Sequence, residues 1–192
     1  MRRAKVRRET RETKVEVEVN LDGEGLFEVS VKPLFLKHML ETLAKHSLID
    51  LRIEAEGDLE HHVVEDVALT LGKAIDEALG AREGITRFGF AYVPMDDALA
   101  RAVVDLSGRS YAVVDLKLRG PSVEDAKASD LAHFFRSLAD AGRLNLHLKV
   151  IYGRDDHHKV EACFKALALA LRQAVSVDPR VKGAASVKGT LK

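Results

Sequence analysis

Two five-residue stretches decide how this chain is organised: His61-His-Val-Val-Glu65 and His157-His-Lys-Val-Glu161. They begin 96 residues apart, at positions 61 and 157, and both follow the pattern HHxVE. One further histidine precedes each stretch, His38 by 23 residues and His133 by 24 residues. A histidine pattern that recurs in the same order at one spacing indicates an internal duplication.

The apolar residues around the histidines repeat together with them. At an offset of 95, Leu36, Met39, Leu40 and Leu43 match Leu131, Phe134, Phe135 and Leu138. From Gly57, which matches Gly153, the offset is 96. The simplest explanation is a tandem duplication with one single-residue insertion or deletion between residues 55 and 57. Two copies are too few for an open solenoid, so we expect the halves to pack on each other.

Hydrophobic periodicity predicts a β-β-α-β-α unit in each half, which is an α+β arrangement. In the first half, residues 14–21 and 26–31 alternate apolar and polar around a glycine-containing turn, a pattern that predicts a β-hairpin. A helix over 36–43, a strand over 51–55 and a long helix over 61–79 are expected to follow.

The second half shows the same plan, with strands expected over 102–106 and 111–118 and a long helix over 156–175. Residues 84–100 connect the halves, with an added strand expected over 87–92. The basic residues 2–8 are expected to form a solvated or disordered terminus, and the glycine-rich tail is expected to be a loop.

Composition excludes several classes of protein. The 192 residues contain 30 Lys and Arg against 30 Asp and Glu, and this zero net charge argues against a nucleic-acid-binding protein. One cysteine excludes an internal disulfide framework and a cysteine-rich zinc module. Because no run of 18 apolar residues and no signal-like apolar region is present, we expect no membrane span and a cytoplasmic protein.

A histidine followed four residues later by a glutamate can bind a metal ion, because both side chains lie on one face of a helix. The neighbouring histidine points about 100° away, so the pattern favours a helix end that serves two metal ions. Two sites with three His and one Glu each are expected, and each site should take ligands from both repeats. The candidate ligands are His38, His61, His62, Glu65, His133, His157, His158 and Glu161.

Such ligands suit divalent Mn, Fe, Co, Ni or Zn, and the residues alone do not choose among these metals. A single histidine beside an apolar stripe is more often structural, so it is the duplication in register that favours a metal site. His147 and His46 gain no such support, because they match Arg52 and Ala141.

Candidate anion-binding residues lie elsewhere in the chain. Arg87 opens an expected strand, and Arg109 lies in a Ser-Gly-Arg turn. Ser186 and Lys188 lie in the glycine-rich tail, where backbone amides can approach an oxyanion. Each of these residues, taken alone, is more often a solvated polar group.

Nine short motifs follow one another along nearly the whole chain. They are Arg11-Glu-Thr, Phe35-Leu-Lys-His-Met-Leu, His61-His-Val-Val-Glu-Asp, Arg87-Phe-Gly, Val93-Pro-Met-Asp-Asp-Ala-Leu, Asp105-Leu-Ser-Gly-Arg, His133-Phe-Phe, His157-His-Lys-Val-Glu-Ala-Cys-Phe-Lys-Ala and Ser186-Val-Lys-Gly. In this order the chain resembles the imidazoleglycerol-phosphate dehydratase family of histidine biosynthesis. The resemblance implies a duplicated α+β fold with helices sandwiched between two mixed four-stranded sheets. It implies one domain, with pseudo-repeats over about 1–83 and 84–180 and a substrate-binding tail over about 181–192.

The resemblance also implies a site. The eight candidate ligands would hold two Mn(II) ions per active site, and the active sites would lie between subunits of a homo-oligomer of twenty-four. Contacts to a small phosphorylated imidazole substrate would fall on Glu12, His46, Arg87, Arg109, Lys165, Ser186 and Lys188. The two arginines, the serine and Lys188 would hold the phosphate. Glu12 is the candidate catalytic acid or base, and His46 is the second candidate.

The implied reaction is dehydration of D-erythro-imidazole glycerol phosphate to imidazole acetol phosphate, which we expect to pass through a metal-bound imidazolate. One alternative is a dinuclear metallohydrolase acting on a small phosphorylated metabolite, although phosphatase sites depend more on aspartate. Another is a non-catalytic protein that stores metal or assembles around it, which would leave the four anion-binding candidates without a role.

Two positions depart from the family pattern. Lys37 precedes the first motif histidine where the family usually has an aspartate, which is a candidate partner for orienting that ligand. The segment before His61 is about two residues shorter, so the loop into that helix is expected to differ. Neither departure removes a ligand.

Overall fold

The computed structural model describes residues 2–191, and its two halves share one order of elements except for a short additional hairpin in the second. The first half contains β1 (Arg3–Glu9), β2 (Thr13–Asn20), β3 (Phe27–Ser30), α1 (Leu34–Ser47), β4 (Asp50–Gly57) and α2 (Glu60–Leu79). The second half contains β5 (Phe88–Met95), β6 (Ala98–Asp105), β7 (Tyr111–Asp115), β8 (Ser122–Val123), β9 (Ala126–Lys127), α3 (Ala128–Ala141), β10 (Asn145–Tyr152) and α4 (Asp156–Val175). The duplicated α+β fold is confirmed, and β5 is the added strand expected over 87–92, whereas β1 and the short hairpin β8–β9 were not predicted.

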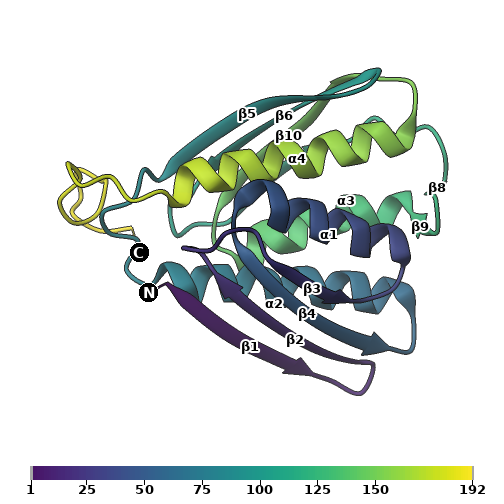
Figure 1. The fold of residues 1–192 in the computed structure, drawn as a ribbon, viewed down its shortest axis with the longest axis horizontal. Coiled ribbons are helices and arrows are strands. Elements are labelled where there is room, and N and C mark those ends of the chain that lie inside the picture. Colours follow the sequence, from purple (N-terminus) through teal and green to yellow (C-terminus); the bar gives the residue numbers. More distant parts are fainter. Residues whose placement is uncertain (1, 192) are drawn as a thin grey trace.

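The four helices lie between two mixed four-stranded sheets, as expected (Figure 1). The strand orders are β1-β2-β4-β3 and β5-β6-β10-β7. Helix α2 covers the first sheet and α4 covers the second, while α1 packs on α4 and α3 packs on α2. Each pair of packed helices therefore combines one helix from each half of the chain.

The expected hairpin over 14–21 and 26–31 is wrong. Strands β2 and β3 are not neighbours, because β4 lies between them, antiparallel to β2 and parallel to β3. The connection from β2 to β3 passes the start of β4, where the backbone N–H groups of Glu24 and Leu26 donate to Asp50 Oδ1 at 2.9 and 3.0 Å. Alternation identifies a strand but does not say which strand it pairs with, and β6 and β7 are separated by β10 in the same way.

The N-terminus was expected to be solvated or disordered; its basic side chains are mostly exposed, but its backbone is ordered. Residues 3–9 form β1, an edge strand antiparallel to β2. Val6 points into the core and is buried, and the Arg8 Nε donates to the buried carboxylate of Asp66 at 2.7 Å. The outward residue Lys5 pairs with Glu16 and Glu18 on β2, so the basic residues of this segment are partly neutralised across the strand pair.

The part of the hydrophobic core that the second half contributes contains a cluster of aromatic side chains. Phe134 and Phe135 on α3 and Phe164 on α4 contact one another with ring centroids 4.7 to 5.6 Å apart. Cys163 on α4 is fully buried beside them, and this burial raises the pKa of its thiol. Among the described helices, none is both long enough and apolar enough to cross a membrane.

Candidate metal centre and substrate site

All four helices begin at the same end of the molecule, opposite the C-terminal tail (Figure 1). The six candidate ligand histidines lie in the first two turns of these helices: His38 on α1, His61 and His62 on α2, His133 on α3, and His157 and His158 on α4. The shared starting point of the helices therefore gathers histidines that are far apart in the sequence.

One cluster, which we call the compact triad, consists of His38, His157 and Glu161. A ligand atom from each residue lies within 4.8 Å of the others. His157 Nε2 is 3.4 Å from Glu161 Oε2 on the next turn of α4, and the ring of His38 lies opposite with its centroid 6.4 Å from that of His157. The triad joins a helix of the first half to a helix of the second.

The equivalent cluster, the open triad, consists of His61, Glu65 and His133. Glu65 lies 3.9 Å from His61 Nε2 through one oxygen and 3.3 Å from His133 Nε2 through the other. The rings of His61 and His133 stack with centroids 5.9 Å apart. This triad also combines the two halves, with α2 supplying two residues and α3 one.

The two remaining candidate ligands lie outside both triads. His62 donates from Nδ1 to Asp58 at 2.8 Å, and His158 donates from Nδ1 to Asp97 at 2.7 Å. These hydrogen bonds raise the pKa of both histidines, and the bond from His158 is the main reason that the pKa of Asp97 is lowered. Within one chain, six of the eight candidate ligands are therefore brought together and two point elsewhere.

Sequence reasoning missed the carboxylates that contact these helix histidines. In both adjacent histidine pairs, Nδ1 of each ring lies within hydrogen-bonding distance of a carboxylate. The distances are 3.2 Å from His61 to Asp130, 2.8 Å from His62 to Asp58, 3.0 Å from His157 to Glu124 and 2.7 Å from His158 to Asp97. A carboxylate at Nδ1 favours the tautomer that leaves the Nε2 lone pair for a metal ion. Together with the imidazole and carboxylate donors of the triads, this arrangement fits divalent transition metals.

Lys165 and His46 lie beside the compact triad. The Lys165 Nζ donates to Glu161 Oε1 at 2.8 Å and also contacts the sulfur of Met95 at 3.2 Å. Burial opposes ionisation of Glu161, but the hydrogen bond from Lys165 and the charges of Lys165, His38 and His157 together outweigh it and keep the pKa of Glu161 below its usual value. Burial lowers the pKa of His46, and the charge of Lys165 lowers it further.

Glu12 lies in the turn between β1 and β2 and is exposed, with Oε2 3.8 Å from His62 Nδ1. The unusual residue Lys37 lies 3.9 Å from Glu41 one turn further along α1. The shortened segment before His61 forms a tight connection, in which the Asp58 backbone N–H donates to the Glu12 carbonyl at 3.0 Å. The short loop therefore brings Glu12 close to the start of α2.

The candidate phosphate-binding residues gather at the other end of the molecule. Arg87 donates to Asp105 at 2.7 and 3.0 Å and to the Ala185 carbonyl at 2.6 Å, so it anchors the tail. Its backbone N–H donates to Ala174, near the last turn of α4. Because α4 has 20 residues, about 30 Å of helix separates this end from the histidines. A single chain does not bring the two groups together.

Arg109 and Lys188 are exposed, and the Ser186 hydroxyl accepts a hydrogen bond from the Lys188 backbone N–H at 3.2 Å. The tail that carries Ser186 and Lys188 passes beside Gly108, whose positive φ of 77° and close approach to the Leu191 carbonyl leave no room for a side chain. Arg109 thus follows directly on a point where the tail touches the body of the protein.

The fold is shared with solved structures of dehydratases, which are hydro-lyases. Imidazoleglycerol-phosphate dehydratase from Staphylococcus aureus is 33% identical with a TM-score of 0.84 and covers 92% of this chain and 99% of its own. The Pyrococcus furiosus enzyme is 41% identical with a TM-score of 0.83, over 96% of this chain and 99% of its own.

Sequence comparison leads to the same group of proteins. The family profile described as imidazoleglycerol-phosphate dehydratase matches residues 31–171. The Dehalococcoides mccartyi and Methanothermobacter thermautotrophicus proteins of that name are each 52% identical, over 99% and 95% of this chain and 97% of their own. This chain belongs to the imidazoleglycerol-phosphate dehydratase family.

Proposed function

We propose that this protein dehydrates D-erythro-imidazole glycerol phosphate to imidazole acetol phosphate in histidine biosynthesis. The observation that carries the proposal is the pair of interlocked His–Glu triads in a chain of this family. Their donor atoms suit divalent ions at which an imidazole can bind, and the substrate of the reaction contains an imidazole ring.

Two divalent ions, for which Mn(II) is our choice, would be held by the two triads. His38, His157 and Glu161 would ligate one ion, and His61, Glu65 and His133 would ligate the other. His62 and His158 would complete the ligand sets of neighbouring copies. When bound, the ions supply Lewis acidity and a template that orients the substrate imidazole.

The complete site would lie between subunits, in an assembly for which the resemblance implies twenty-four copies. Two features support an intersubunit site: His62 and His158 lie outside the triads of their own chain, and α4 separates the histidines from the basic residues. A substrate made of one ring, three carbons and a phosphate cannot span that length. The histidine end of one chain and the basic end of another chain can meet around it.

The proton transfers would fall to side chains near the triads. Glu12, exposed beside His62, would exchange the protons of the departing hydroxyl and of the neighbouring carbon. His46 is the second candidate, because a lowered pKa leaves it neutral near pH 7 and able to accept a proton. Arg109, Ser186 and Lys188 would hold the phosphate, and Arg87 would do so directly or by fixing the tail.

Elemental analysis of the purified protein, combined with turnover of imidazole glycerol phosphate, tests the proposal. We expect two divalent ions per chain and a ketone product without release of inorganic phosphate. Release of phosphate would instead identify a metallohydrolase, and metal binding without turnover would identify a storage or assembly protein. Glu12→Gln should lose activity while keeping its metal, and near wild-type turnover of this variant would remove Glu12 from the mechanism.

A further inference from the structure

The second half of the chain has a connection that the first half lacks. In the first half, residues 31–33 lead from β3 directly into α1. In the second half, residues 116–127 lead from β7 to α3 and contain the short hairpin β8–β9. The hairpin turn consists of Glu124 and Asp125, between the paired residues Val123 and Ala126.

Glu124 contacts a member of the compact triad. Its Oε1 lies 3.0 Å from Nδ1 of His157, on the opposite side of the ring from Glu161, which lies 3.4 Å from Nε2. The edge-on ring of Phe35 packs against the same imidazole with centroids 5.0 Å apart. The ring of His157 is therefore held from several directions, with its Nε2 turned toward the triad.

Asp125 contacts the helix that carries another member of the triad. Its two carboxylate oxygens accept hydrogen bonds from the backbone N–H groups of Leu34 at 2.6 Å and Phe35 at 2.9 Å, in the first turn of α1. Pro33, at the N-cap of α1, has no side-chain oxygen to fill this role. One turn from the second half thus reaches both the α1 helix of His38 and the ring of His157.

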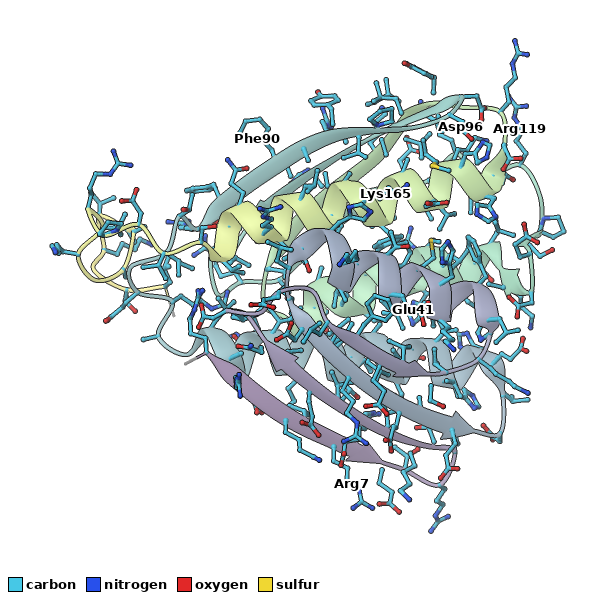
Figure 2. All side chains as sticks on the ribbon, viewed as in Figure 1. Arg7, Glu41, Phe90, Asp96, Arg119 and Lys165 are labelled. Atoms are coloured by element: carbon cyan, nitrogen blue, oxygen red, sulfur yellow. The ribbon has the colours of Figure 1, made fainter. Side chains whose placement is uncertain are left out.

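The rest of the connection is tied to α4 itself. Asp156 Oδ2 accepts from the backbone N–H groups of Arg119 and Gly120 at 2.8 and 2.9 Å. The buried Lys159 donates to the Lys117 carbonyl at 2.9 Å and to Asp156 at 2.6 Å. Figure 2 shows Arg119 at the end of the molecule where α4 begins. These contacts fasten the connection, and with it the turn of Glu124 and Asp125, to the first turn of α4, which carries His157 and His158.

The backbone at the turn gives independent support for a special role of Glu124. Its φ is 51°, at the first position of a two-residue hairpin turn. Glycine is the residue favoured at such a position, because a side chain with positive φ is strained. A glutamate there is less favourable for the turn than glycine, while its side chain makes the contact with His157 that glycine could not make.

We propose that Glu124 and Asp125 position the compact triad. Glu124 keeps the proton of His157 on Nδ1, so that Nε2 presents its lone pair to a metal ion, and Asp125 sets the start of α1 and with it the place of His38. This inference rests on the proposed metal-binding function.

The test is a competition titration of the full-length protein with Mn(II) and a chromogenic chelator, together with thermal melting of the metal-free form. Glu124→Gly should keep or raise the melting temperature, because it removes the strain. The same variant should weaken one Mn(II) per chain by about tenfold or more, the usual effect of losing a residue that orients a ligand. Glu124→Gln, whose amide oxygen can still accept from Nδ1, should recover part of the affinity.

Lys117→Gly is the matched control, because Lys117 also has positive φ, 49°, in the same connection but does not contact His157. It should leave both Mn(II) affinities unchanged. Unchanged binding by Glu124→Gly, or equal weakening of both ions with a lower melting temperature, overturns the positioning role while the proposed function stands. A wild-type protein that binds no divalent ion overturns both.

Discussion

The second histidine of each pair is held by a carboxylate in both halves, but the carboxylate comes from different places. His62 donates to Asp58, which lies four residues earlier, and Glu12 is further away at 3.8 Å. His158 donates instead to Asp97 in the turn between β5 and β6, at 2.7 Å. The candidate ligands are therefore alike in the two halves, whereas the carboxylates that contact the second histidine of each pair are not equivalent.

The sheet register shows that Glu12 and Asp97 are equivalent positions. Ile53 of β4 and Leu148 of β10 are equivalent residues in the repeat. Val17 of β2 pairs with Ile53, and Ala102 of β6 pairs with Leu148, so β2 and β6 correspond at an offset of 85 residues. The same offset relates residues 12 and 97. The same position therefore carries a carboxylate in both halves. In the first half it is Glu12, our candidate for proton transfer, and in the second it is Asp97, the hydrogen-bond partner of His158.

The largest effect is expected from removing the carboxylate of either triad. Glu65→Gln and Glu161→Gln should each lose one divalent ion per chain and more than about 100-fold in turnover, beyond the usual effect of losing an orienting residue. Metal analysis and the dehydration assay measure both. Glu77→Gln, on the same helix as Glu65 but paired with Lys73 near its end, is the control and should behave like wild type. If only one triad variant lost metal, the two triads would not be equivalent metal sites.

A second contrast lies where each long helix packs on its sheet. Gly89 of β5 is equivalent to Ala4 of β1, but α4 lies so close that a methyl group on Gly89 would be 1.9 Å from the Ala170 carbonyl. Gly89→Ala should therefore destabilise the protein by about 1–3 kcal/mol through overpacking. Ala4→Gly should cost only about 0.5–1 kcal/mol, from backbone entropy. Thermal melting at one protein concentration compares them, and equal shifts would contradict this difference in packing.

The parts of the fold that could be predicted from the sequence are those governed by local periodicity. The helices α2 and α4 and the His–Glu spacing follow from the 3.6-residue repeat, so residues such as Glu65 and Glu161 could be identified without a structure. The equivalence of Glu12 and Asp97 could not, because the extra connection before α3 changes the offset from 85 to 95. That change also concealed the match between β5 and the N-terminal strand β1, which was not predicted.

Pairing between distant segments carried no local signal. The contact of Glu124 with His157 depends on a turn that no helical or strand periodicity describes. Asp125 caps a helix that lies 91 residues earlier, and an N-cap search near Pro33 cannot find it. The separation of the phosphate-binding candidates from the triads likewise appears only once the direction of α4 is known.

A smaller effect is expected at the N-caps of the two long helices. Asp155 caps α4 by accepting from the His158 backbone N–H at 3.2 Å, whereas Leu59, its equivalent at an offset of 96, has no oxygen to cap α2. Asp155→Ala should destabilise the protein by about 1 kcal/mol, and Leu59→Asp should stabilise it by about 0.5–1 kcal/mol. Melting of the metal-free protein measures both changes. A lower melting temperature for Leu59→Asp would mean that α2 begins with a geometry that does not accept a cap.

The smallest effect is expected on the outer faces of the sheets, which differ in chemistry. The first face is charged, with Arg52 beside Glu18, Glu28 and Glu54, and Figure 2 shows Arg7 projecting from it into solvent. The second face carries exposed aromatic side chains, among them Phe90, which is 64% exposed.

Arg52→Ala should lower the melting temperature slightly in dilute buffer and not at all in about 1 M salt, where charges on the surface are screened within about 3 Å. Phe90→Thr is the matched variant on the other face, and its effect should not diminish with salt, because contact between apolar surfaces is strengthened rather than screened. Sedimentation alongside melting separates stability from association. A salt-insensitive Arg52→Ala, or a Phe90→Thr whose effect disappears in salt, would mean that the two faces are not distinguished by the forces their residues suggest.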